Sequence, residues 1–175
     1  PSSRVNFNAL ADQEISNIPN YGNLTLAGAA NKKLIGTTSV QTQVETAPGS
    51  ELDLNGKTLQ IQGVTPFKNS GILTANANGS TIELNSTNLL QTFTIAGTIT
   101  ENYINNLTIA NTFNSGVLTT SGVVIGSNPT AFFIKDLVIN NDAILNLAGR
   151  RINILNAINN DGLIVGNASG STIAF

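Results

Sequence analysis

Four residue types are missing from this 175-residue chain: cysteine, histidine, methionine and tryptophan. Without cysteine the chain has no disulfide framework and no thiolate ligands for a metal ion. Without histidine and cysteine it also lacks the side chains that most often act as acid–base groups and nucleophiles near neutral pH. Among the charged side chains, carboxylates, lysines and arginines remain as candidates for catalysis, and these absences favour a protein that is not an enzyme.

Charged residues are scarce as well, at 10% of the chain against about 25% in a typical globular protein. The net charge is −2, and the adjacent basic pairs are Lys32-Lys33 and Arg150-Arg151. Nucleic acid binding needs clustered basic side chains that displace counterions. We therefore expect no nucleic acid partner and interpret both pairs as solvated turns. No stretch approaches the roughly 18 apolar residues of a membrane span, which predicts that the chain has none.

The polar surface must come from uncharged side chains, because the chain has 26 asparagines, 20 threonines and 13 serines. Hydrophobic residues make up 41% of the sequence, enough for a sizeable core, whereas aromatic residues make up only 5%. Threonine, valine and isoleucine suit the pleated surface of a strand, and asparagine and glycine suit turns with positive φ. The composition predicts short strands joined by tight turns.

Three sequence blocks occur twice in the same order, which predicts an internal repeat of about 85 residues. The first copy of the blocks lies at 23–27, 52–61 and 69–84, and the second at 106–110, 145–154 and 160–175. The variable insertion between blocks falls around 111–130. We predict two repeat units, 1–88 and 89–175, in one continuous array.

The two ends of the chain and the boundary between the units share one short motif. Val5-Asn6-Phe7-Asn8 resembles Ile82-Glu83-Leu84-Asn85, and both resemble Ile173-Ala174-Phe175. Gln13 follows the first copy of this motif, as Gln91 follows the second. A complete repeat domain carries atypical, polar capping units at its ends. The shared motif therefore predicts a segment of a longer array, flanked by further repeats or covered by a partner.

Apolar and polar residues alternate within the blocks, as in 52–61, where Asn55-Gly56-Lys57 provides a turn. Turn signals recur about every 8–12 residues, which predicts an all-β protein. Two architectures fit: a right-handed parallel β-solenoid built from two repeats of about 85 residues, or two tandem Ig-like β-sandwiches. The short strands and few aromatics favour the solenoid. Stacking of Leu52, Leu59 and Ile72 on residues about 20 positions away would identify it.

The blocks resemble the repeats of very large surface proteins of Bacteroidota. The phrases YxNLTLxG, ATLDLNGxTLxIxG and NxGTxxAxxGTVxFNG recur in those proteins, often with QxI after the boundary. Here they correspond to Tyr21–Gly28, Ser50–Gly63, Asn69–Asn85 and Gln13-Glu14-Ile15. The resemblance covers nearly the whole chain, but it is lost at 111–130, and the second copy has Ala148 where the first has Asn55.

This resemblance implies an extracellular, cell-surface protein exported by a type IX secretion route, with gliding adhesins as one group of that kind. It implies a repetitive stalk or adhesive filament that mediates attachment. The expected partners are flanking repeats of the same chain or a secretion and anchoring machinery, together with glycans or surfaces.

The sequence shows no catalytic, cofactor-binding or metal site. No two of its aspartates are closer than six residues; they are Asp12, Asp53, Asp136, Asp142 and Asp161. Asn140-Asn141-Asp142 and Asn159-Asn160-Asp161 offer oxygen ligands for calcium, but each has a single carboxylate, so we interpret both as structural turns. The alternative functions are a β-helical polysaccharide-active enzyme, which would need carboxylates converging across turns, and an end-to-end polymerising fibre subunit.

Overall fold

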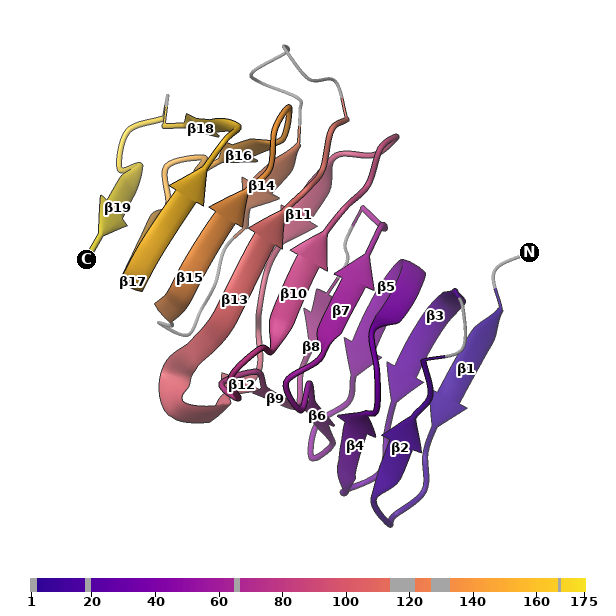
Figure 1. The fold of residues 1–175 in the computed structure, drawn as a ribbon. Helices are drawn as coiled ribbons and strands as arrows, with labels where there is room; N and C mark the ends of the chain where they lie inside the picture. Colours follow the sequence, from indigo (N-terminus) through magenta and orange to yellow (C-terminus); the bar gives the residue numbers. More distant parts are fainter. Residues whose placement is uncertain (1–2, 18–19, 65–66, 114–121, 127–132, 167) are drawn as a thin grey trace.

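The computed structural model describes residues 3–17, 20–64, 67–113, 122–126, 133–166 and 168–175. Within these residues the regular structure is β-strand, apart from a single 3₁₀ turn at Thr100–Asn102. Every strand pair is parallel. The chain therefore coils into a parallel β-solenoid (Figure 1), as the alternating pattern predicts, and not into Ig-like sandwiches. In the part of the chain described, no helix is long and apolar enough to cross a membrane.

One sheet of ten strands, sheet A, runs the whole length of the described solenoid. Its order is β1-β3-β5-β7-β10-β13-β15-β17-β19, with β8 beside β5. The bounds of its strands are β1 (Arg4–Phe7), β3 (Tyr21–Leu26), β5 (Thr38–Thr46), β7 (Thr58–Ile61), β8 (Phe67–Asn69), β10 (Thr81–Leu84), β13 (Tyr103–Ile109), β15 (Phe133–Ile139), β17 (Arg151–Asn160) and β19 (Thr172–Ala174).

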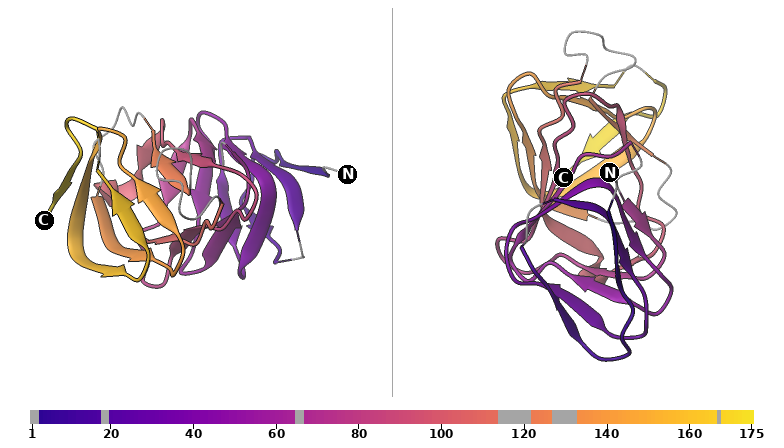
Figure 2. Two further views of the ribbon diagram at one scale, coloured as in Figure 1. Left: turned by 90° about the horizontal axis from the view of Figure 1, so that it is seen from above. Right: turned by 90° about the vertical axis from the view of Figure 1, so that its right-hand side faces the viewer.

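Two shorter sheets close the coils on the other side, sheet B with strands between residues 13 and 99 and sheet C with strands between residues 91 and 165. Sheet B contains β2 (Gln13–Ile15), β4 (Asn31–Leu34), β6 (Glu51–Asp53), β9 (Ile72–Thr74) and β12 (Thr98–Ile99). Sheet C contains β11 (Gln91–Phe93), β14 (Val123–Ile125), β16 (Ile144–Asn146) and β18 (Leu163–Val165). The N-terminal and C-terminal coils form two lobes that are displaced sideways from each other (Figure 2).

The repeated blocks occupy corresponding places in the solenoid. The first block forms most of β3 and β13, the second forms β6–β7 and the start of β16–β17, and the third ends in β10 and β19. The shared motif forms β1, β10 and β19, which we call the seam strands. Arg4 of β1 lies opposite Asn23, as Thr81 of β10 lies opposite the matching Asn106. In each unit, the sheet opposite sheet A begins with a strand whose first residue is glutamine. This strand is β2 of sheet B in the first unit and β11 of sheet C in the second. Of the insertion, residues 114–121 and 127–130 lie outside the described part.

The sideways displacement arises inside sheet A. Thr38–Val40, the first part of β5, pair with β7, whereas Val44–Thr46, its last part, pair with β3 and β8. In the same way β19 pairs with the start of β17, and β15 pairs with its middle and end. Within each unit, the paired region of sheet A therefore shifts along the direction of the strands. The sheet opposite sheet A does not continue across this shift, and sheet C begins at a displaced position after sheet B.

Inward apolar side chains stack from coil to coil and form the core. Leu59, Ile82, Leu107 and Leu137 lie side by side on successive strands, and all four are buried. Burying such a side chain contributes about 2 kcal/mol. Leu52 likewise lies between residues 20 and 21 positions away, as a solenoid requires.

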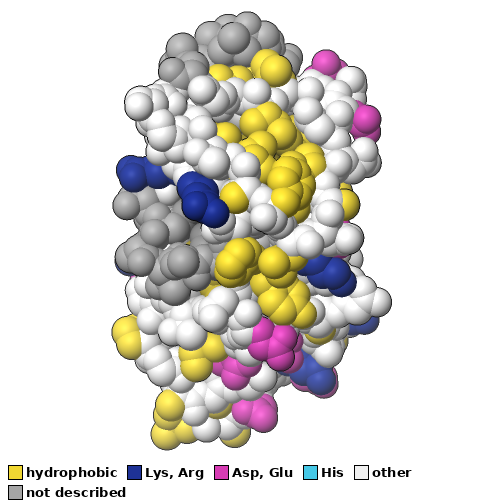
Figure 3. Space-filling view, turned by 90° about the vertical axis from the view of Figure 1, so that its left-hand side faces the viewer, with side chains coloured by type: hydrophobic (Ala, Val, Ile, Leu, Met, Phe, Trp, Pro, Cys, Tyr) yellow, Lys and Arg dark blue, Asp and Glu magenta, His cyan; other side chains and the backbone are white. Residues whose placement is uncertain are grey.

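Ile72 differs from the other two residues expected to stack. It pairs with Glu51, 21 positions away, as expected for a solenoid, but its side chain is exposed. Exposed hydrophobic side chains also occur at the C-terminal end, where Leu163 and Phe175 are 42% and 87% exposed. Figure 3 shows hydrophobic side chains gathered on that end of the molecule.

The corner between β6 and β7 is the turn that the sequence predicts. Asn55 and Gly56 both have positive φ, +49° and +70°. The Lys57 N–H donates to the Leu54 carbonyl at 2.8 Å, and the Asn55 N–H donates to Asp53 Oδ1 at 2.7 Å. An Asn-Gly turn often closes a hairpin. Here it joins strands of two different sheets, because β7 pairs with β5 and β10.

The matching corner of the second unit places Ala148, not asparagine, at φ +48°. Left-handed backbone costs a residue with a Cβ about 1 kcal/mol, and asparagine tolerates it better than alanine. We expect Ala148→Asn to raise the free energy of unfolding by about 1 kcal/mol, measured by urea denaturation. The matched control Asn55→Ala should lower it by at least as much, because Asn55 Nδ2 also donates to the Leu34 carbonyl at 3.1 Å. Destabilisation by Ala148→Asn would contradict this assignment of the strain.

Candidate functional site

The outward side of sheet A carries polar side chains that are linked from coil to coil. Ser39 Oγ donates to Gln60 Oε1 at 2.8 Å, and Gln60 Nε2 donates to Glu83 Oε1 at 3.2 Å. Asn85 Nδ2 donates to the same carboxylate oxygen at 3.0 Å. Further along the sheet, Asn106 Nδ2 donates to Thr81 Oγ1 at 3.2 Å. We call this surface the polar ladder; its amides and hydroxyls are held in place by their neighbours.

The N-terminal end of the polar ladder is charged. Glu45 accepts from Lys68 Nζ at 2.9 Å and from Arg4 Nη2 at 3.4 Å. Both basic side chains are 60% exposed, so these ion pairs contribute at most about 1 kcal/mol. A shallow depression of about 170 Å³ lies beside them, lined by Arg4, Asn23, Thr25, Gln43 and Glu45.

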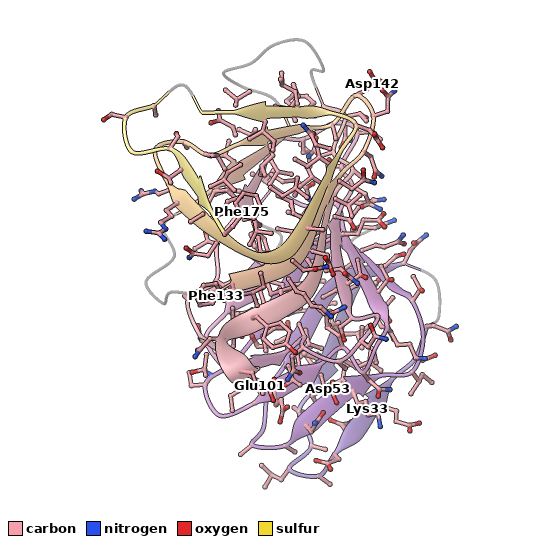
Figure 4. The ribbon with its side chains drawn as sticks, turned by 60° about the vertical axis from the view of Figure 1, so that its left-hand side comes forward. Lys33, Asp53, Glu101, Phe133, Asp142 and Phe175 are labelled. Carbon is pink, nitrogen blue, oxygen red and sulfur yellow. The ribbon has the colours of Figure 1, made fainter. Side chains whose placement is uncertain are left out.

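Sheet B carries a second polar depression, of about 430 Å³. Glu14, Lys33 and Asp53 lie side by side on its consecutive strands, so their charges alternate in sign. Asp12 Oδ1 accepts from the Asn31 N–H at 3.1 Å, and Asp53 accepts from the corner backbone described above. Two of the carboxylates in this depression therefore hold turns in place (Figure 4 labels Lys33 and Asp53).

A pocket of about 400 Å³ at the corner between sheets A and C brings together Asp142 and Asp161. These are the carboxylates of the two segments considered above as calcium ligands. Asp142 lies in a turn with φ +62°, and its Oδ2 accepts from Asn141 Nδ2 at 2.7 Å. Asp161 follows Asn160, where β17 ends. Among the described residues, no group of three or more acidic, histidine or cysteine side chains is placed to hold a metal ion.

Lys32-Lys33 is not the solvated turn that the sequence predicts, because the pair lies in a strand and only Lys33 is exposed. Both residues lie in β4, and the Lys32 side chain is fully buried. Its Nζ donates to the carbonyls of Ala9 at 2.9 Å and Ala11 at 3.2 Å. Neighbouring residues of a strand face opposite sides, so only Lys33 is exposed. Of the other basic pair, Arg150 is exposed at the end of a turn, and Arg151 is exposed at the start of β17.

Gln91 is the residue whose role the sequence did not explain. It follows a seam strand, as Gln13 does, and its side chain is completely buried. Its Nε2 donates to the carbonyls of Ile61 at 2.8 Å and Gly63 at 3.1 Å. Its Oε1 accepts from the Ser86 N–H at 3.2 Å and from Asn111 Nδ2 at 2.8 Å. We call the side-chain amide of Gln91 the seam amide, and its hydrogen bonds connect the start of sheet C to the preceding coil. Its only sequence signal is the glutamine that recurs after the seam motif.

These features define the protein as a β-solenoid whose polar groups are spread over its outer faces and corners. Comparison of the chain with protein-family models, with curated proteins and with solved structures gave no match.

Proposed function

We propose that this chain is a structural and adhesive segment of a large secreted cell-surface protein, in which the solenoid forms a rod-like stalk or filament. The observation that carries the proposal is sheet A, a single hydrogen-bonded ladder that passes through both sequence repeats. Stability in such an array grows with each added coil, because each coil packs on its neighbours. An array of this kind extends without requiring a different core at each step.

The polar ladder supports an adhesive role for the rod. Its side chains are mostly uncharged hydrogen-bonding groups held by neighbouring coils, as between Ser39, Gln60 and Glu83. Such a surface suits weak contacts with glycans or other hydrated surfaces. Repetition along a filament turns weak contacts into strong attachment through effective concentration.

The resemblance to Bacteroidota surface repeats supports the extracellular location, export by a type IX route and a relation to gliding adhesins. Flanking repeats of the same chain or an anchoring machinery are the partners that this proposal expects.

The test is attachment under flow of beads that carry the chain at increasing density, on glycan-coated and bare surfaces. We expect retention to rise steeply with density. Asn106→Lys with Thr108→Lys replaces two outward groups of β13, each beside an acidic residue on a neighbouring strand, and should lower retention about tenfold, roughly 1.4 kcal/mol. Thr92→Lys on sheet C is the matched control and should leave retention unchanged.

Two results would contradict the proposal. One is equal retention of the β13 variant and the control. The other is release of soluble sugar from polysaccharides that Asp142→Asn abolishes, which would identify the corner pocket as part of an enzyme site.

A further inference from the structure

Two corners on adjacent coils of the first unit carry the same dipeptide. Asn55-Gly56 joins β6 to β7, and Asn78-Gly79 joins β9 to β10 (Figure 1). They are the two Asn-Gly sequences of the chain. The corners lie against each other, because a Cβ added to Gly56 would be 2.9 Å from the Asn78 carbonyl oxygen. One molecule therefore holds the same dipeptide in two different surroundings.

An asparagine followed by glycine can lose ammonia from its side chain without an enzyme. The glycine nitrogen gives up its proton and attacks the asparagine Cγ, the Cγ–Nδ2 bond breaks, and ammonia leaves. Water then opens the cyclic imide on one side of its nitrogen or the other. The products are aspartate and isoaspartate, in which the main chain runs through the side chain. Glycine favours the attack because it has no Cβ to restrict the backbone. The reaction needs a free asparagine side chain and a free glycine N–H.

The Asn55-Gly56 corner meets neither requirement. Asn55 Nδ2 donates to the Leu34 carbonyl of the preceding coil at 3.1 Å, and the Gly56 N–H donates to Ser80 Oγ of the following coil at 3.0 Å. Ser80 is completely buried, so water does not compete for the second of these bonds. Neighbouring coils therefore hold both the leaving group and the nucleophile of this corner.

The Asn78-Gly79 corner meets both requirements. Both residues are exposed. Within the part of the chain described, neither the Asn78 side chain nor the Gly79 N–H makes a hydrogen bond. The turn is closed by the Ser80 N–H, which donates to the Ala77 carbonyl at 2.9 Å. This bond leaves the leaving group and the nucleophile of the second corner free.

The second unit keeps the geometry of these corners without the asparagines. Its matching dipeptides are Ala148-Gly149 and Ser169-Gly170. The Gly149 N–H donates to Ser171 Oγ at 3.0 Å, as the Gly56 N–H does to Ser80. The serine of the following coil is therefore part of the corner in both units, whereas the fold does not require an asparagine at position 78.

We propose that Asn78 is a site of spontaneous deamidation, and that its conversion to isoaspartate exposes Asn55 to the same reaction. Isoaspartate at position 78 lengthens the main chain two residues before Ser80 and displaces the hydroxyl that holds the Gly56 N–H. Asn78 therefore converts first and Asn55 second. Each conversion adds one negative charge to the first unit, whereas the matching corners of the second unit cannot react. The inference rests on the corners alone and does not require the adhesive function.

Peptide mapping by mass spectrometry, after incubation of the folded chain at neutral pH, measures both positions in one sample. Two hydrogen bonds must break before Asn55 reacts and none before Asn78 does, so Asn78 should convert about thirtyfold faster. In urea, with both corners unfolded, the two rates should be nearly equal because both asparagines precede glycine. This control separates the effect of the fold from the reactivity of the dipeptide. Electron-transfer fragmentation identifies isoaspartate among the products.

Two variants test the coupling through Ser80. Ser80→Ala removes one of the two bonds that protect the first corner, and should speed the conversion of Asn55 about fivefold while leaving Asn78 unchanged. Asn78→Ser introduces the residue that the second unit has at this position. In that variant, Asn55 should keep its slow initial rate throughout the incubation. Circular dichroism checks that both variants are folded, and Asn78→Ser carries the test alone if Ser80→Ala does not fold.

Three outcomes would overturn the proposal. Equal rates at Asn55 and Asn78 in the folded chain would show that the contacts between coils do not protect the first corner. An unchanged rate at Asn55 in folded Ser80→Ala would show that the bond to Ser80 does not restrain the reaction. The same late acceleration of Asn55 in Asn78→Ser as in the unaltered chain would show that the corners react independently. None of these readouts depends on surface attachment, so the bead assay can fail separately.

Discussion

Replacing Gln91 with leucine should lower the free energy of unfolding by about 4 kcal/mol, a loss at the upper end of what single substitutions cause. The side chain is completely buried, and its amide meets two carbonyls, one backbone N–H and one asparagine amide. Leucine fills a similar volume but makes none of these bonds. Each buried polar group left without a partner costs about 1–3 kcal/mol, so the losses add up quickly.

The matched control is Gln13→Leu at the corresponding place of the first unit. Gln13 is only partly buried, and its Oε1 accepts from the Ala9 N–H at 3.2 Å. Its loss should cost about 1 kcal/mol. Urea denaturation followed by circular dichroism measures both variants. Equal losses at Gln91 and Gln13 would show that the seam amide is not the source of stability at the junction.

Replacing Gly71 with alanine should cost about 3 kcal/mol. A Cβ at this position would lie 2.3 Å from the Ser50 carbonyl oxygen and 2.5 Å from that of Ala47. Both atoms belong to the backbone of the preceding coil, and the Ser50 carbonyl already accepts from the Ile72 N–H at 2.9 Å. A flexible side chain would rotate away, but a paired backbone moves only if the corner opens. Gly162→Ala, at the matching corner, should show a similar loss.

Gly49→Ala separates this crowding from the conformational effect of glycine. The nearest atom to a Cβ there is Ala29 Cβ at 4.0 Å, but Gly49 has φ +81°. Its loss should therefore be only the left-handed backbone cost, about 1 kcal/mol. Thermal and urea unfolding of the three variants give the comparison. A loss at Gly71 no larger than that at Gly49 would show that the coils tolerate closer approach than the structure indicates.

Local sequence signals predicted short strands and their corners, and they favoured the solenoid over tandem sandwiches. Alternation around Leu52 and Leu59 placed their side chains in the core, and Asn55-Gly56 marked a corner because both residues tolerate positive φ. The repeated sequence motif identified the three segments that form the seam strands. These features depend on residues that are close in sequence or on direct repetition, which one chain reveals.

Features that depend on pairing between coils could not be predicted from the sequence. Alternation within β5 does not specify that Val40 lies beside Ile61 while Val44 lies beside Phe67. The shared pocket of Asp142 and Asp161 arises only because consecutive coils turn at the same corner. The buried Lys32 has no sequence signature, because its partners are backbone carbonyls of the preceding coil. Adhesion, export and location stay predictions from resemblance.

The sideways movement of the ladder has a mechanical consequence. Within β5 the pairing shifts by about six residues, roughly 20 Å along the strand, while one unit adds four strand steps, roughly 19 Å, across the sheet. In an array that repeats this step, every unit is offset along the strands by the same distance. The long axis of the array is therefore oblique to both the strands and their hydrogen bonds. Tension along such a filament therefore has a shearing component that loads many backbone bonds together, in place of opening them one coil at a time.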